Sequence, residues 1–238
     1  MLEDLDKRLK DINGGLVLDV ATGIGDFIGF IKEFGSYDKI IAIDSMPRME
    51  EFFKKNFVDD NSVEFSLMDA EVIDFPEEQF DTVCVSNSLH HFKNPEKVLN
   101  NMYRVLKTGG LFMINEMRSD ELSKAQISHD KVHRFSAEMD RIRGNYHDDT
   151  YSRDKLLSFF NSILLDKIEF FDYFFPIDEA QSIAQVERLK DMLTKQVEQF
   201  KDHEKFDYLL EKSKAILAYL DEYGFAPASS VFLIGVKN

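Results

Sequence analysis

Hydrophobic runs alternate with amphipathic segments along the first half of the chain. Five short apolar runs predict buried strands, at residues 16–20, 39–44, 63–68, 80–85 and 111–116. Apolar residues at helical spacing predict helices around them, the clearest at residues 2–12, from Pro47 onward, and at residues 95–106. Alternation at this pace implies a parallel sheet with helices on both faces.

Two helical regions lie beyond the fifth predicted strand. Residues 119–149 carry an apolar helical stripe and, beside it, a polar stripe made of His129, His133, Ser136 and Asp140. Residues 177–223 contain two amphipathic helices with a turn near residue 202, which predicts an antiparallel helical hairpin. We interpret both regions as insertions in one domain over residues 1–238, the first as a substrate cap. The hairpin either covers the pocket or forms a homodimer contact.

The candidate chemistry depends on residues 16–30. A strand leads into a turn through Gly23 and Gly25 and then into a helix, so the backbone can approach a ligand and direct free N–H groups at it. The dinucleotide fingerprint is incomplete, because Ala21 stands at its first glycine and no glycine falls at its third. Asp19 would repel a pyrophosphate but suits S-adenosylmethionine, which carries a sulfonium and an ammonium group. The turn therefore favours S-adenosylmethionine over NAD, and a methyl donor over an oxidoreductase cofactor.

A carboxylate or amide side chain falls at or next to the end of each of the five predicted strands: Asp19, Asp44, Asp69, Asn87 and Glu116. Ligands of parallel sheets bind beyond the carboxyl ends of the strands. There Asp44 can accept both hydroxyls of a ribose, and Asp69 can accept a hydrogen bond from an adenine amine. The five positions together predict one binding edge.

In these segments the chain resembles the class I S-adenosylmethionine-dependent methyltransferases, in particular their small-molecule branch. LDVATGIGDF is similar to the family's acid-and-glycine motif, with Ala21 in place of the first glycine and Gly25 as the last. MDA (residues 68–70), FDTVCVSNSLHHF and LKTGGLFMINE resemble its next motifs in order. The resemblance covers residues 16–116 and implies an α/β, Rossmann-like doubly wound sheet of about seven strands. The sixth would correspond to residues 166–175, and the seventh, antiparallel to the others, to residues 230–236.

The resemblance also implies the cofactor and the reaction. The cofactor is S-adenosyl-L-methionine, and the positions that would bind it are Asp19, Ala21, Thr22, Gly23, Gly25, Asp44, Ser45, Met46, Asp69, Ala70, Ser86 and Asn87. The reaction is methyl transfer to a small-molecule acceptor by in-line displacement, which requires the enzyme mainly to hold the nucleophile and exclude water. A non-catalytic S-adenosylmethionine-binding or protein-interaction module on the same fold is the alternative.

Histidines supply the candidate catalytic residues. His91 follows the fourth predicted strand, where an acceptor should approach, and His129 and His133 lie on the polar stripe. A solvent-facing His91 and a packing role for the stripe are the alternatives, since a general base is needed only for a protonated acceptor. His129 and His133 also have the spacing of metal ligands, with Asp140 or His147 to complete a set. We expect no metal, because no Glu follows His129 as in a zinc protease.

Composition narrows the partners. The formal net charge of −15 argues against nucleic acid and anionic membranes as partners. Arg134, Arg141 and Arg143, near the polar stripe, either meet an anionic substrate or pair with the chain's own carboxylates. Cys84 is the single cysteine, which excludes an internal disulfide and a multi-thiolate metal site. No run is long and apolar enough for a membrane span and no signal-peptide pattern is present, so we expect a cytoplasmic protein.

Overall fold

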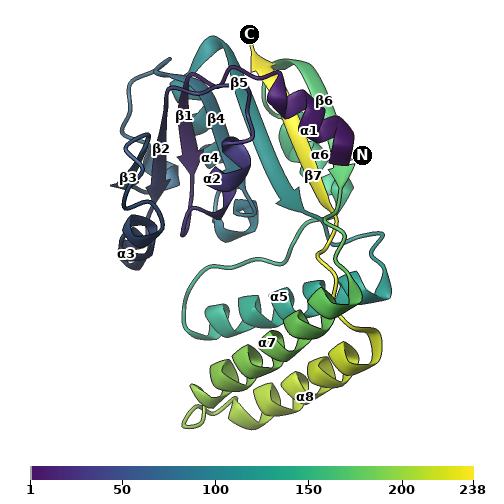
Figure 1. Ribbon diagram of the computed structural model, residues 1–238. Helices are drawn as coiled ribbons and strands as arrows, with labels where there is room; N and C mark the ends of the chain where they lie inside the picture. Colours follow the sequence, from purple (N-terminus) through teal and green to yellow (C-terminus); the bar gives the residue numbers. More distant parts are fainter. Residues whose placement is uncertain (1) are drawn as a thin grey trace. The chain divides into compact units, whose positions relative to one another are not determined.

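The computed structural model describes residues 2–238, so Met1, where the predicted domain begins, lies outside the described part. Within that part, seven strands form one sheet in the order β3-β2-β1-β4-β5-β7-β6 (Figure 1). The strands are β1 (Leu16–Val20), β2 (Lys39–Asp44), β3 (Val63–Leu67), β4 (Phe80–Ser86), β5 (Leu106–Met117), β6 (Leu165–Tyr173) and β7 (Ser230–Lys237). The α-helices are α1 (Leu2–Lys10), α2 (Asp26–Ile31), α3 (Pro47–Asn56), α4 (Pro95–Val105), α5 (Lys124–Ile142), α6 (Arg153–Phe160), α7 (Glu179–Glu198) and α8 (Phe206–Tyr223). Two short 3₁₀ helices are η1 (Ala70–Val72) and η2 (Leu89–His91).

The pairing of the strands confirms the predicted fold class. β1 to β5 run parallel, and β7 is antiparallel to both β5 and β6. β1 has β2 on one side and β4 on the other, so the strand order reverses at β1. In doubly wound sheets this reversal opens a crevice at the carboxyl ends of the strands. The predicted binding edge lies there.

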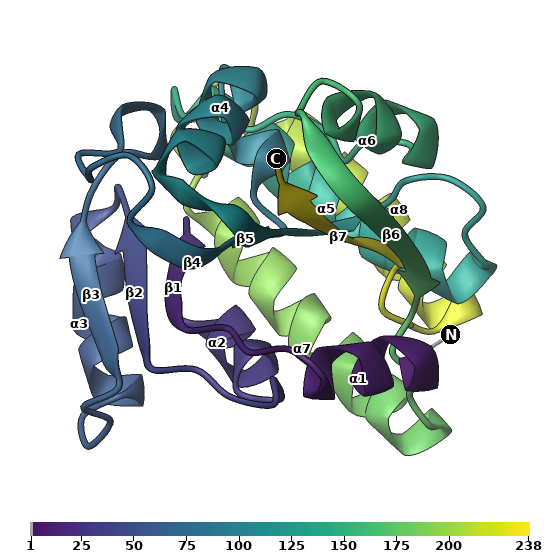
Figure 2. The ribbon, with the colours of Figure 1, turned by 90° about the horizontal axis from the view of Figure 1, so that it is seen from above.

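Helices cover both faces of this sheet. α1, α2 and α3 lie on one face, and α4 and α6 lie on the other (Figure 2). Leu5 and Leu9 of α1 and Ile28 and Ile31 of α2 are fully buried in one apolar cluster with Val17 of β1. Burying each such side chain stabilises the fold by roughly 1.5–3 kcal/mol. The apolar stripes read from the sequence are therefore the surfaces that fix both helices on the sheet.

One strand boundary differs clearly from the prediction. α4 ends at Val105 and passes directly into β5 at Leu106, whereas the sequence pattern places a glycine turn before a strand at residue 111. Gly109 has a φ of 78°, and the register between β4 and β5 shifts near the start of β5. The glycine pair is thus accommodated by an irregular strand start and is not a loop. The other strand ends lie close to their predicted positions.

The chain separates into two compact units. The sheet unit contains the residues up to Met117, Arg153–Tyr173 and Ser230–Asn238. The helical unit contains Arg118–Ser152 and Phe174–Ser229. Both predicted insertions, residues 119–149 and 177–223, fall within the helical unit. That the whole chain works as a single domain stays a prediction.

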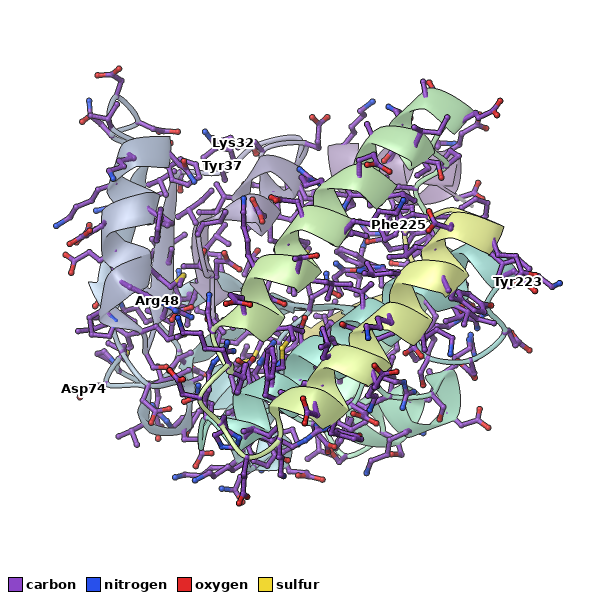
Figure 3. The ribbon with its side chains drawn as sticks, turned by 90° about the horizontal axis from the view of Figure 1, so that it is seen from below. Lys32, Tyr37, Arg48, Asp74, Tyr223 and Phe225 are labelled. Carbon is purple, nitrogen blue, oxygen red and sulfur yellow. The ribbon has the colours of Figure 1, made fainter. Side chains whose placement is uncertain are left out.

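Three long helices build the helical unit. α5, α7 and α8 lie side by side, with Phe225 just beyond the end of α8 (Figure 3). Their core contains Phe135 and Met139 of α5, Leu193 of α7 and Leu209 of α8. α7 and α8 form the predicted helical hairpin. Among the described residues no helix is long and apolar enough to cross a membrane.

Candidate active site

β1 leads into a turn with left-handed backbone. Ala21, Gly23 and Gly25 have φ angles of 55°, 57° and 90°. The Thr22 N–H donates to the Ile43 carbonyl at 2.9 Å, which ties the turn to β2. Glycine adopts left-handed angles freely, whereas the same conformation costs an alanine roughly 1–2 kcal/mol of conformational energy. The turn therefore carries local strain at Ala21.

We expect Ala21→Gly to raise the free energy of unfolding by roughly 0.5–1 kcal/mol. Relief of the left-handed alanine outweighs the greater freedom of glycine in the unfolded chain. Denaturant titration of both proteins measures the difference. Ala184→Gly, at an exposed position inside α7, is the matched control and should lower stability by about 0.5–1 kcal/mol. Equal losses in the two variants would show that Ala21 is unstrained.

The two glycines of the turn meet different surroundings. A Cβ added to Gly25 would lie 2.3 Å from Cε2 of Phe57, so packing requires glycine there. A Cβ added to Gly23 would meet no described atom within 4 Å. The Gly23 N–H donates to Oδ2 of Asp44 at 2.9 Å. Close packing against Phe57 therefore requires glycine at position 25. Gly23 borders open space at the carboxyl ends of the strands.

Asp19 is a buried carboxyl group at the start of this turn. Its exposed fraction is 1%, and Oδ2 has no hydrogen-bond partner in good geometry among the described residues. The thiol of Cys84 lies 3.7 Å from Oδ1. Burial raises the pKa of Asp19 to about 7, and contacts from Thr22 and Cys84 oppose this only in part. An unsatisfied buried carboxyl oxygen is a group that a cationic ligand would satisfy.

Asp44 connects the turn to the end of β2. Oδ2 accepts from the Gly23 N–H, and Oδ1 accepts from the Met46 N–H at 2.8 Å. The Asp44 side chain is 8% exposed. Each carboxylate oxygen accepts two hydrogen bonds, so both retain capacity for a further donor such as a hydroxyl. Ser45 and Met46 follow on the surface.

Asp69 and Ala70 lie beyond the end of β3. Oδ1 of Asp69 accepts from the Glu71 N–H at 2.8 Å, which caps η1, and the side chain is exposed. Ala70 is buried, and its carbonyl accepts from Nδ2 of Asn101 at 3.2 Å. The backbone N–H of Met68 donates to the Asp44 carbonyl at 2.9 Å, so the ends of β2 and β3 are joined. The structure thus brings Asp69 and Ala70 to the same edge as Asp44.

Ser86 and Asn87 continue the edge at β4. Asn87 has a φ of 46°, and its Oδ1 accepts from the Met117 N–H at 2.9 Å. Oγ of Ser88 donates to the Ser86 carbonyl at 2.7 Å and lies 3.4 Å from the Ala21 carbonyl. The end of β4 is therefore connected to β5 on one side and to the glycine turn on the other.

Glu116 organises the segment after β4. Its Oε1 accepts from the Ser88 and Leu89 N–H groups at 2.6 and 2.8 Å, and Oε2 lies 3.3 Å from Nδ1 of His90. The glutamate is 1% exposed. The sequence indicated its place at a strand end but not this role, which depends on the fold of η2. Glu116 fixes η2, which carries the exposed candidate His91.

In the helical unit, α5 gives the two predicted catalytic histidines different surroundings. Nδ1 of His129 accepts from the Ala228 N–H at 2.9 Å, and its ring lies 5.3 Å from that of Phe225. Burial lowers the pKa of His129. These contacts indicate a packing role, and we do not retain His129 as a candidate base. The ring of His133 lies 5.1 Å from that of His147.

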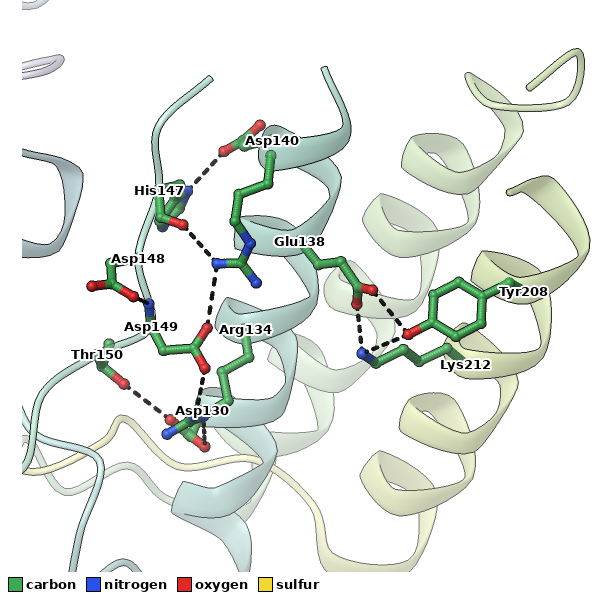
Figure 4. Close-up of polar contacts among 11 residues, drawn as sticks. Asp130, Arg134, Glu138, Asp140, His147, Asp148, Asp149, Thr150, Tyr208 and Lys212 are labelled. Carbon is green, nitrogen blue, oxygen red and sulfur yellow. Dashed lines mark hydrogen bonds and ion pairs between the residues drawn. The ribbon is translucent and has the colours of Figure 1, made fainter. Parts of the chain in front are cut away.

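The arginines near α5 pair with groups of the chain itself, and Figure 4 shows Arg134 with its partners Asp130 and Asp149. Arg134 contacts Asp130 at 2.8 Å and Asp149 at 2.7 Å. Arg141 donates to the His147 carbonyl at 2.6 Å. Arg143 lies 3.3 Å from Asp140. Of the two interpretations left open by the sequence, pairing with the chain's own acceptors is the one that the structure supports.

Part of the chain is similar in sequence to known methyltransferases. Residues 18–114 match a family model described as a methyltransferase domain. A ubiquinone/menaquinone biosynthesis C-methyltransferase, UbiE of Methylococcus capsulatus, is 32% identical over 120 residues, which cover 48% of this chain and 48% of that protein. The chain therefore spans about half the length of the curated relatives it matches.

Solved structures share the fold over nearly the whole chain. The YcgJ protein of Bacillus subtilis superposes with a TM-score of 0.65 at 18% identity, covering 100% of this chain and 97% of that one. Phosphoethanolamine N-methyltransferase 2 of Haemonchus contortus, solved in complex with S-adenosyl-L-methionine, gives a TM-score of 0.57 at 21% identity and covers 99% of this chain and 51% of that one. At these identities the similarity concerns the fold.

Proposed function

The chain carries a class I S-adenosylmethionine-dependent methyltransferase domain, and from this premise we propose that it transfers a methyl group from S-adenosylmethionine to a small-molecule acceptor. One observation carries the proposal. Asp19 holds a buried carboxyl oxygen without a partner among the described residues, beside a turn whose Gly23 borders open space. A ligand with a positive charge and a nucleoside satisfies both features.

The residues of the carboxyl edge fit this ligand. We assign the ammonium group to Asp19, the ribose hydroxyls to Asp44 and the adenine amine to Asp69. Asp44 is preorganised for this role, because two backbone N–H groups already fix its orientation. Ser86 and Asn87 would border the donor at the end of β4. These roles follow from position and from hydrogen-bonding capacity.

The chemistry demands little of the protein. When bound, S-adenosylmethionine supplies a methyl group on a positively charged sulfur, which is already a good leaving group. The chain's own residues have to hold and orient the two reactants and exclude water. Glu116 contributes by fixing η2, on which His91 is exposed. His91 is the candidate to contact the acceptor or to take its proton where the acceptor is protonated.

A small-molecule acceptor is supported by the relatives and by the charge. The name of the Methylococcus relative describes a C-methyltransferase of ubiquinone and menaquinone biosynthesis, and these quinones are small molecules. The net charge of −15 disfavours nucleic acid, whose phosphates bind clustered Lys and Arg. That residues 119–149 form a substrate cap and that the α7–α8 hairpin forms a homodimer contact both stay predictions.

Turnover in the presence of a metabolite pool tests the proposal. The full chain is incubated with S-adenosylmethionine and the small-molecule fraction of a cell extract, and S-adenosylhomocysteine is followed by mass spectrometry. We expect release that depends on the extract, together with a product that has gained one methyl group. Asp44→Ala is the inactive control. Binding of the donor without turnover in any extract would favour the non-catalytic module.

Asp19 gives donor binding a pH dependence. Because burial raises its pKa to about 7 from 3.8, the free folded protein keeps this proton up to neutral pH and loses stability as the pH rises through that range. A cationic donor binds the ionised carboxylate and must displace the proton. We expect the association constant to rise about tenfold per pH unit below pH 7 and then to level off.

Titration calorimetry with S-adenosylmethionine between pH 5 and 7.5 measures this slope. Asp19→Asn should bind more weakly and with a flat pH profile, because no proton remains to be displaced. An unchanged slope in Asp19→Asn would assign the dependence to another group.

A further inference from the structure

His147 is held in a fixed position within the helical unit. It follows α5 after a short turn in which the Gly144 N–H donates to the Arg141 carbonyl at 3.0 Å. Arg141 in turn donates to the His147 carbonyl at 2.6 Å. The imidazole is 5% exposed. Figure 4 shows this segment beside α5, with His147 directed toward Asp140.

Asp140 determines which nitrogen of His147 faces away from it. Nδ1–H of His147 donates to Oδ2 of Asp140 at 2.8 Å. An ionised carboxylate can only accept a hydrogen bond, so Nδ1 of His147 is the donor in this pair. With Nδ1 protonated, the lone pair of the neutral ring lies on Nε2. A carboxylate that orients an imidazole in this way is the usual partner of a metal-binding histidine.

His133 stands next to this oriented imidazole. Its ring centroid lies 5.1 Å from that of His147, with the planes at 78°. One ring nitrogen of each residue lies within 4.8 Å of the other. With a transition-metal ion about 2.0–2.1 Å from each nitrogen, the two nitrogens of a tetrahedral site lie roughly 3.3–3.4 Å apart, so side-chain rotations have to bring the two rings closer together. Packing alone explains the edge-to-face contact between the two rings, but it does not explain why Asp140 accepts a hydrogen bond from His147.

We propose that His133 and His147 are ligands of a divalent transition-metal ion, with Asp140 as the carboxylate that orients His147. Imidazole ligands select zinc, copper, nickel or iron over magnesium and calcium. The site departs from our sequence-based expectation of no metal. His129, which spacing alone pairs with His133, already uses Nδ1 to accept from Ala228. The inference is independent of the proposed methyl transfer.

Binding of metal alone to the full chain tests the site. Chelator-treated protein is titrated with Zn²⁺ by calorimetry and with Co²⁺ by visible absorption, which reports imidazole coordination. We expect one ion per chain in the parent. His147→Ala and His133→Gln should weaken binding at least about 100-fold, and Asp140→Asn about 10–100-fold. His203→Ala, in the loop between α7 and α8, is the matched control and should bind as the parent does.

Circular dichroism of each variant separates loss of the site from loss of the fold. Asp140→Asn retains an oxygen that can accept from His147 but loses the negative charge, so it tests how much the carboxylate strengthens the ligand imidazole, with little structural change. Absence of stoichiometric binding in the parent overturns the proposal. Parent-like affinity in folded His133→Gln or Asp140→Asn overturns it equally, because other groups would then hold the ion.

Discussion

Replacing Asp44 with alanine is expected to weaken binding of S-adenosylmethionine about 100-fold or more. The substitution removes both proposed hydrogen bonds to the ribose, each worth roughly 1.5–3 kcal/mol to a charged acceptor. It also removes the acceptors of the Gly23 and Met46 N–H groups, which hold the turn at the end of β1. Calorimetric titration of the parent and the variant measures the change.

Two further variants bracket the Asp44 result. Asp44→Asn keeps one acceptor oxygen and should lose less affinity than Asp44→Ala, on the order of tenfold. His203 lies in the loop between α7 and α8, so His203→Ala should leave the affinity for S-adenosylmethionine unchanged. Donor binding by Asp44→Ala equal to that of the parent would show that the ribose assignment is wrong.

Replacing each glycine of the turn with alanine is expected to separate folding from ligand binding. Gly25→Ala places a Cβ 2.3 Å from Phe57 at a φ of 90°. Overpacking of roughly 1–3 kcal/mol then adds to backbone strain of roughly 1–2 kcal/mol, so we expect a large fall in stability. Gly23→Ala meets open space and carries the strain alone. Its methyl group would occupy the space that we assign to the donor.

Denaturant titration and donor titration on both variants distinguish these effects. Gly23→Ala should lose about 1–2 kcal/mol of stability but at least about tenfold in donor affinity at a temperature where it is folded. Gly25→Ala should lose more stability than Gly23→Ala. Parent-like affinity in Gly23→Ala would place the donor away from this turn.

The sequence predicts the sheet well because its strands are buried, and buried strands appear in the sequence as short apolar runs. Val17 and Ile40 are fully buried in adjacent parallel strands, as their apolar runs indicate. Asp19 lies one residue before the end of β1 and Asp44 ends β2, so the strand pattern alone brings them to one edge. The pattern does not indicate the start of β5, because a glycine pair after a helix is typical of a turn, whereas here it lies in an irregular strand start.

Contacts that depend on tertiary folding were less accessible. Glu116 lies 28 residues after Ser88, whose N–H it accepts, and no local pattern links the two. His129 and His133 look equivalent on a helical stripe. In the structure, however, Nδ1 of His129 already accepts a hydrogen bond from the backbone N–H of Ala228. The pairing of Asp140 with His147 requires a turn after α5 that brings the chain back along the helix. Spacing indicates which side chains share a face, but not what lies opposite.

We expect the buried Asp19 carboxyl beside the glycine turn, whose Oδ2 has no hydrogen-bond partner in good geometry among the described residues, to select a cationic methyl donor over a dinucleotide. Calorimetric titration of the full chain with S-adenosylmethionine and, separately, with NAD at pH 7.5 tests it most directly. We expect saturable binding of S-adenosylmethionine at micromolar concentration and no binding of NAD. Saturable binding of NAD, with no response to millimolar S-adenosylmethionine, would contradict it.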